Sequence, residues 1–108
     1  MLVRFTHEAR REFHTLPLAE KEAMRNAIGK LEQAGETLAY PHSSQVRAAA
    51  RLRELRPRAG RSRWRGFYRR IGAELLIGAF GPEAQADPTG FARAVRAAEE
   101  RLAALEEG

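Results

Sequence analysis

Apolar residues recur at helical spacing in two neighbouring stretches near the start of the chain. Ala9, Phe13 and Leu16 lie three or four positions apart, and Thr6 before them is a residue type that caps helices. A second stripe follows Pro17, whose missing N–H suits a first helical turn, and Gly35 is a typical helix stop. The second stripe consists of Ala23, Met24, Ala27, Ile28 and Leu31. We therefore predict two antiparallel helices in the first 35 residues.

A third helical pattern extends nearly to the end of the chain. Asp87 is a good N-cap and Pro88 suits the first helical position. The apolar stripe then steps by four and three residues alternately, through Phe91, Val95, Ala98, Leu102 and Leu105. This spacing predicts an amphipathic helix packed on the core, and its distal part could alternatively meet a partner helix.

The middle of the chain has the pattern of strands. The segments "RLREL", "RWRGFYRRI" and "ELLIGAF" are separated by turn residues at Pro57, Gly60 and Gly72, which predicts an antiparallel meander. The last segment is apolar almost throughout, so it is expected to be central and covered on both faces. Residues 2–5 could add a short strand, whereas residues 36–50 are expected to be a connection. We predict one α+β domain over residues 1–108, with a small antiparallel sheet packed on two N-terminal helices plus a C-terminal helix.

The middle strand alternates between two kinds of side chain. One face would carry Arg63, Arg65, Phe67 and Arg69, and the other Trp64, Gly66, Tyr68 and Arg70. If Trp64 and Tyr68 pack against the helices, Arg63 and Arg65 should point outward together.

Composition narrows the class of protein. The chain has no cysteine, which excludes disulfides and thiolate metal sites. It starts without the apolar block of a secretion signal, and its longest apolar run is too short to cross a bilayer. We therefore expect a cytoplasmic protein that does not act at a membrane.

Positive charge is concentrated in residues 47–70, which hold ten arginines and one acid, Glu54. This segment carries a charge of +9 in a chain of +5, so the remainder carries −4. Seventeen arginines against two lysines suggest a codon bias, but such a bias does not explain the clustering. Clustered arginines favour a polyanionic partner.

The side chains of this segment that could bind or cleave RNA are arginines and aromatic residues. Guanidinium groups grip phosphates bidentately and can stabilise a phosphorus under in-line attack, while aromatic rings give bases a surface on which to stack. The alternative is a charged sheet face whose aromatics belong to the core. His42, in a loop, is the only histidine considered as a proton carrier, although a solvated loop histidine is the simpler interpretation. No metal-binding, glycine-rich or nucleophile motif stands out, so no metal or cofactor is expected.

The order of the motifs resembles the RelE/ParE superfamily of type II toxins, in its HigB-like, phage-derived branch. The matching segments are "LP" at 16–17, "LRELR" at 52–56, "RWRGFY" at 63–68 and "LLIGAF" at 75–80, followed by Gln85 and Pro88. The resemblance implies a metal-free endoribonuclease that cleaves mRNA on the ribosome and is silenced by an antitoxin, often a helix-turn-helix protein.

The resemblance also assigns residues. It implies that Arg65 stabilises the transition state and that Arg56 contacts a phosphate. Independently of the resemblance, the arginine cluster itself predicts that Arg53, Arg58, Arg61 and Arg63 bind the RNA backbone, with Trp64 and Tyr68 as aromatic support.

One segment departs from the family pattern. The chain reads "FGPEAQADP" at 80–88, where HigB-like toxins usually carry lysines at the positions of Pro82, Glu83 and Ala86. At about 1 kcal/mol or more for each charge-assisted contact, this loss could remove several powers of ten in binding or rate. Two alternatives to a nuclease therefore stay open: a catalytically degenerate module that binds antitoxin or RNA, and a ParE-like topoisomerase inhibitor.

Overall fold

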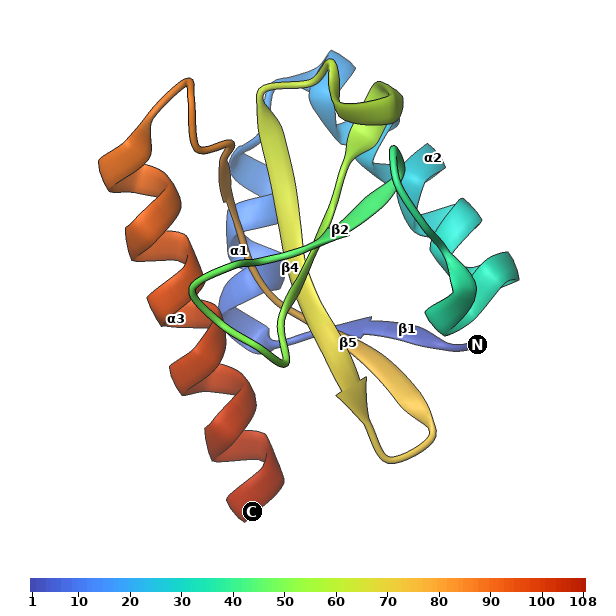
Figure 1. Cartoon of the computed structure of the whole chain (residues 1–108), viewed down its shortest axis with the longest axis vertical. Coiled ribbons are helices and arrows are strands. Elements are labelled where there is room, and N and C mark those ends of the chain that lie inside the picture. Colours follow the sequence, from blue (N-terminus) through green and yellow to red (C-terminus); the bar gives the residue numbers. More distant parts are fainter.

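Three helices and a five-stranded sheet make up the computed structural model, which describes all 108 residues (Figure 1). The helices are α1 (His7–Thr15), α2 (Leu18–Ala34) and α3 (Pro88–Glu107). The strands are β1 (Val3–Phe5), β2 (Ser43–Gln45), β3 (Arg53–Leu55), β4 (Trp64–Ile71) and β5 (Glu74–Pro82), in the spatial order β1-β5-β4-β3-β2. Short 3-10 turns form η1 (Gly35–Thr37) and η2 (Pro57–Gly60). The predicted α+β class is confirmed.

The helix ends lie where the sequence placed them. The Thr6 side chain accepts a hydrogen bond from the Ala9 backbone at 3.1 Å, and that of Asp87 accepts one from Gly90 at 2.9 Å. Gly35 ends α2 with a φ of 59°, a left-handed conformation that favours glycine. Local capping chemistry therefore sets one end of each helix.

The antiparallel meander β3-β4-β5 is confirmed, and β5 lies between β1 and β4 as its apolar sequence indicated. Two features differ from the prediction. The first strand pairs with β5 in parallel, so the sheet is mixed. Residues 43–45, expected to be part of a connection, form β2 at the edge of the sheet. This strand is short and polar, and its backbone pairing with β3 stabilises it without any hydrophobic alternation.

Helices cover both faces of the sheet. On one face, α1 and α2 enclose a cluster that includes Phe13, Met24, Leu31, Tyr68 and Ile77. On the other face, α3 and the β2–β3 loop enclose a cluster that includes Val46, Phe67, Val95, Ala98 and Leu102. Figure 1 shows α3 along one side of the sheet, α1 behind β4, and α2 on the side opposite α3. Neither face of β4 is therefore simply open to solvent.

A bulge in β5 links the two layers. The pairing of β4 with β5 shifts between Phe67 and Tyr68, so Gly78 has no partner residue in β4. The Gly78 carbonyl instead accepts hydrogen bonds from the Thr6 hydroxyl at 3.2 Å and from Arg101 at 3.1 Å.

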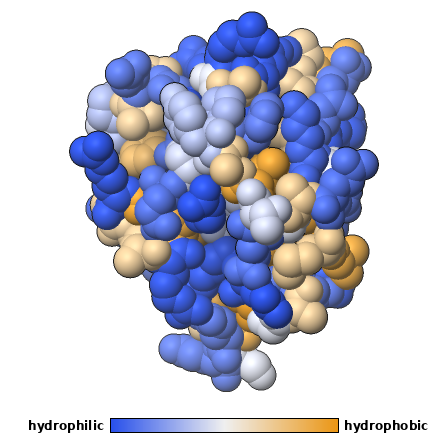
Figure 2. Space-filling model, turned by 45° about the vertical axis from the view of Figure 1, so that its right-hand side comes forward, coloured by the Kyte–Doolittle hydropathy of each residue, from blue (hydrophilic) through white to orange (hydrophobic).

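No helix is long and apolar enough to cross a membrane. On the face in Figure 2, hydrophilic residues predominate and hydrophobic residues form small patches between them.

Candidate functional site

Two of the arginines singled out by sequence bind one carboxylate. Oε1 of Glu54, on β3, accepts a hydrogen bond from Nε of Arg65, on β4, at 3.0 Å. The same oxygen accepts one from Nη1 of Arg56, just after β3, at 3.4 Å. We call these three residues the Arg–Glu–Arg cluster. The structure thus brings together the two arginines expected to be catalytic, around an acid to which sequence reasoning gave no role.

Arg65 lies inside the protein, so the expectation that it points outward with Arg63 is wrong. It is 2% exposed and donates to Glu54 and to the carbonyls of Ser62, Trp64 and Gly60, the last three at 2.6, 3.0 and 3.2 Å. Burial lowers the pKa of Arg65, and the hydrogen bond to Glu54 opposes that shift. Because an arginine stays charged in proteins, this web of acceptors is what permits its burial.

Arg56 is the most accessible of the three residues of the cluster, with an 18% exposed side chain. Its Nε donates to the Pro41 carbonyl at 2.9 Å, and its guanidinium carbon lies 5.0 Å from the centre of the Tyr40 ring. Its Nη2 makes no hydrogen bond within the chain and is not buried. Arg56 therefore presents one free donor edge to solvent.

Gly60 makes room for this arrangement. A Cβ at that position would overlap Nη2 of Arg56, and the φ of 93° is one that other residues rarely adopt. Tyr40, which sequence reasoning did not single out, is 73% exposed beside Arg56. A large aromatic next to a proline in a loop was the available signal for it.

The four arginines expected to bind RNA are dispersed. Arg58 is paired with Glu20 at 2.7 Å, and Arg53 donates to the Ser43 hydroxyl at 3.0 Å. Arg61 donates to the carbonyl of Arg58 at 3.1 Å, and Arg63 lies over the Trp64 ring at 5.7 Å. Of the four, only Arg58 has a carboxylate partner, so Arg53, Arg61 and Arg63 keep their charge available. They do not form one continuous cradle, because Arg63 lines a separate cleft of about 350 Å³ against α3.

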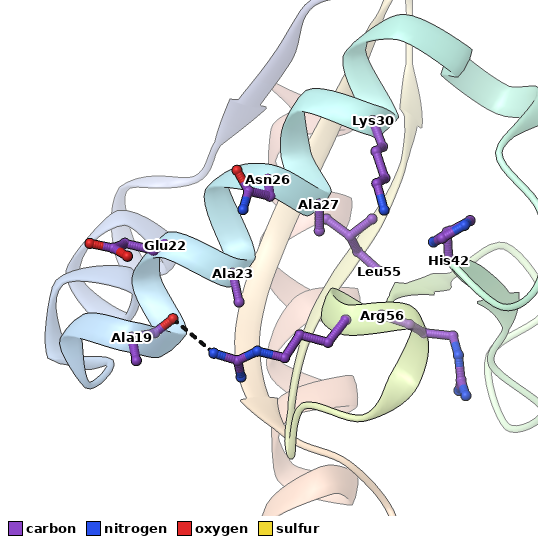
Figure 3. Close-up of a pocket in the computed structure, with 10 residues that line it drawn as sticks. Ala19, Glu22, Ala23, Asn26, Ala27, Lys30, His42, Leu55 and Arg56 are labelled. Carbon is purple, nitrogen blue, oxygen red and sulfur yellow. Dashed lines mark hydrogen bonds between the residues drawn. The ribbon is translucent and has the colours of Figure 1, made fainter.

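His42 lies in a cleft that Arg56 also lines. This cleft, of about 280 Å³, separates α2 from the segment that follows β3. In Figure 3, Lys30 and His42 extend toward each other across it, and the guanidinium of Arg56 points away. Glu54 does not line the cleft. A proton carrier at His42 would therefore share this cleft with Arg56 but not with Glu54.

Trp64 and Tyr68 face the α1–α2 core, as the alternation of β4 indicated. Tyr68 is buried, and its hydroxyl shares a hydrogen bond with that of Ser43 at 2.5 Å. This bond fastens the edge strand β2 to the core. Tyr68 is thus a core residue, whereas Trp64 is only partly buried and lies beneath the Arg63 guanidinium.

The segment that departs from the family pattern supplies no cation. The backbone N–H of Glu83 donates to the Arg63 carbonyl at 2.7 Å, and its carboxylate accepts from the Ala86 backbone. Pro82 ends β5, and Ala86 is exposed. Glu83 also acts on Arg65 through its charge, as a minor influence that raises the pKa of Arg65. No three His, Asp or Glu side chains gather in a way that could hold a metal ion.

Solved structures place this architecture among RelE-type toxins. The chain superposes with a TM-score of 0.58 on a chain of the toxin–antitoxin complex RelBE2 from Mycobacterium tuberculosis, with 26% identity over 76% of this chain and 96% of that one. It superposes with a TM-score of 0.62 on a free mutant form of the E. coli toxin RelE, with 15% identity over 88% of this chain and 94% of that one. No curated protein sequence matches the chain at a significant level.

A family model places the chain more closely. The model of the phage derived protein Gp49-like family matches residues 11–77, which is more than half of the chain. The chain belongs to this family, and it has the fold of the RelE toxin superfamily. The match spans Glu54, Arg56 and Arg65 but ends before the substituted segment at 80–88.

Proposed function

We propose that the chain is the toxin of a type II toxin–antitoxin pair and that it cleaves mRNA on the ribosome without a metal ion. Family membership and the RelE-type fold support the toxin assignment. The observation that carries the proposed activity is the free Nη2 of Arg56 beside the carboxylate of Glu54. A fixed cation beside a potential proton acceptor is what transfer of a phosphate to a neighbouring hydroxyl requires.

Each residue has a distinct part in this proposal. Arg56 would donate to a non-bridging phosphate oxygen and stabilise the charge that develops there. Arg65, which is buried, would act through Glu54 and is a positioning residue. The exposed ring of Tyr40 would stack on a base, a contact of about 1–3 kcal/mol. The unpaired Arg53, Arg61 and Arg63 would attract the RNA backbone.

The proposed partners follow from the same assignment. A cognate antitoxin would silence the toxin, which the complex of RelBE2 among the similar structures supports. The resemblance to HigB-like toxins suggests that this antitoxin is a helix-turn-helix protein. An mRNA substrate on the ribosome implies action in the cytoplasm.

Cleavage of mRNA on translating ribosomes tests the proposal. We expect the wild type to cut the message and Arg56→Gln to cut at least about 100-fold more slowly, since it removes a donor to the developing charge. Arg70→Gln is the matched control, because Arg70 is in the same segment but pairs with Glu36 at 2.7 Å away from the cluster. Equal losses in the two variants would show that overall charge, and not this site, is responsible.

Burial of Arg65 and the acid at Glu83 favour a second candidate, a toxin-fold protein that binds antitoxin or RNA without cutting. The triple variant Pro82→Lys, Glu83→Lys and Ala86→Lys separates the two functions. A wild type that leaves the message intact, together with a triple variant that cuts it, would establish the second candidate.

A further inference from the structure

We propose that Glu54 is the general base of the RNA cleavage, accepting the proton of the attacking 2′-hydroxyl. This inference rests on the proposed function and adds a proton acceptor, a role that the arginines cannot fill. In-line attack by a 2′-hydroxyl needs a group that takes up its proton, and an arginine side chain has no free lone pair to do so. Glu54 is the only acid in the 24 residues that carry the arginines.

The two oxygens of Glu54 have different surroundings. Both hydrogen bonds from the arginines go to Oε1. Oε2 makes no hydrogen bond within the chain and is not fully buried, although the side chain as a whole is only 12% exposed. One oxygen is thus fixed by two cations, while the other is reachable from solvent and free to accept a proton.

The arginines hold this carboxylate in one orientation. The guanidinium of Arg65 is bound to three backbone carbonyls of residues 60–64, so its Nε is a fixed donor to Oε1. Arg56 adds a second, longer bond to the same atom. A base held in this way loses little entropy when the substrate arrives, which favours proton transfer.

Two other candidates for the base are less well placed. His42 lies in the cleft beside α2, which Arg56 also lines (Figure 3), but its contact with Arg56 is through the backbone, where its carbonyl accepts from the Arg56 N–H at 2.8 Å. The carboxylate of Glu83 is engaged by the backbone of Ala86. Among the groups in contact with Arg56, only Glu54 has a carboxylate.

The proposed step is balanced without a metal or cofactor. The 2′-O–H bond breaks and its proton moves to Oε2 of Glu54, while the 2′-oxygen forms a bond to the adjacent phosphorus. The bond from phosphorus to the 5′-oxygen breaks, and that oxygen takes a proton from water. The products are a 2′,3′-cyclic phosphate and a 5′-hydroxyl, and Glu54 then releases its proton to solvent.

Two substitutions of Glu54 separate a base from a structural anchor. Glu54→Gln keeps the size of the side chain and a hydrogen-bond acceptor but removes the basic carboxylate. Glu54→Asp keeps the carboxylate but shortens its reach. If Glu54 is the base, Glu54→Gln should lower kcat on ribosome-bound mRNA by about 100- to 10,000-fold, and Glu54→Asp should lose less. If Glu54 only anchors Arg65, the shorter Asp variant should be the more damaged of the two.

The affinity for uncleavable mRNA on the ribosome also distinguishes a general base from a residue that only anchors Arg65. The probe is a ribosome programmed with mRNA that carries 2′-deoxyribose at the cut position. This mRNA lacks the attacking hydroxyl, so the toxin can bind the complex but cannot cleave the mRNA. The affinity of this complex for Glu54→Gln should equal that for the wild type or exceed it, because a negative charge near the phosphate has been removed. Thermal unfolding of each variant shows whether it is folded, and Glu54→Asp carries the comparison with the wild type if Glu54→Gln does not fold.

The outcomes distinguish this inference from the proposed function. If the wild type cleaves mRNA and Arg56→Gln does not, while Glu54→Gln keeps kcat within a few-fold of the wild type, the assignment of Glu54 is overturned and the nuclease stands. Weaker binding by Glu54→Gln with an unchanged kcat would also overturn it. If the wild type cuts no mRNA, both proposals fail.

Discussion

The Arg56 guanidinium can pack against residue 60 only because a glycine there has no side chain. A Cβ there would overlap Nη2 of Arg56, the one free donor of the proposed phosphate contact. The Gly60 carbonyl also accepts from Arg65 at 3.2 Å. One residue of the turn after β3 therefore touches both arginines of the cluster.

We predict that Gly60→Ala displaces Arg56 and lowers RNA cleavage at least about 10-fold, a loss of about 1.4 kcal/mol in transition-state stabilisation. Gly72→Ala is the matched control, because Gly72 also has a positive φ, 63°, but open space around its Cβ position. Each variant should lose about 1–2 kcal/mol of stability through the backbone strain alone, measured by urea unfolding. A cleavage loss of equal size in both variants would remove the special role of Gly60.

Single residues show where sequence reasoning succeeds and where it fails. Thr6 and Asp87 cap helices by contacts within three residues, so local chemistry was enough to predict them. The orientation of Arg65 depends on Glu54 in the neighbouring strand and on the carbonyls of a turn, which alternation along β4 cannot reveal. Glu54 could have been noticed as the only acid among ten arginines, but its partners are set by strand pairing.

At the scale of elements, Glu20 fastens the turn after β3 to α2. One carboxylate oxygen accepts from the Ser62 hydroxyl at 2.6 Å, and the other pairs with Arg58 at 2.7 Å. The hydrogen bond from Ser62, followed by that from Arg58, lowers the pKa of Glu20 below its ordinary value near 4.5. The turn that carries Gly60 is thus bound to a helix by a contact that depends on pH.

We predict that this contact stabilises the fold above about pH 4.5 and is lost in acid. A carboxyl whose pKa is lower in the folded state than in the unfolded state adds stability above the unfolded pKa, and that stability disappears as the pH falls through the folded value. Glu20→Gln should therefore lower the free energy of unfolding at pH 7 and flatten its decline below about pH 4.5. The exposed Glu22, which forms no ion pair, is the control. Identical pH profiles for Glu20→Gln and the wild type would contradict the prediction.

The elements also differ in how far the sequence could predict them. The stripes of α2 and α3 and the apolar β5 were readable because each buries a regular set of side chains. The edge strand β2 was not, because backbone pairing and polar side-chain contacts of Ser43 and Gln45 hold it, and these leave no hydrophobic pattern. The parallel pairing of β1 is a long-range choice, since it joins residues 3–5 to residues 75–77.

At the scale of the whole molecule, folding neutralises much of the arginine segment. Six of its ten arginines form ion pairs with carboxylates: Arg51, Arg56, Arg58, Arg65, Arg69 and Arg70. Four carboxylates serve these six arginines: Glu106 and Glu54 each bind two, and Glu20 and Glu36 bind one each. Three of the four lie outside the segment, so the acidic remainder of the chain folds back on it. The local charge of +9 therefore overstates what a polyanion would meet. Only Arg47, Arg53, Arg61 and Arg63 have no carboxylate partner.

This neutralisation predicts a moderate dependence of RNA binding on salt. Four unpaired arginines and the free edge of Arg56 make about five phosphate contacts possible, so the slope of log K against log salt on single-stranded RNA should be about −3.5. The double variant Arg61→Gln and Arg63→Gln should reduce its magnitude by about 1.4, since each phosphate contact contributes about 0.7. The matched pair Arg51→Gln and Arg70→Gln should change it by less than about 0.5, because these arginines are already paired with Glu106 and Glu36. A slope near −7, as ten engaged arginines would give, would show that RNA displaces the internal carboxylates.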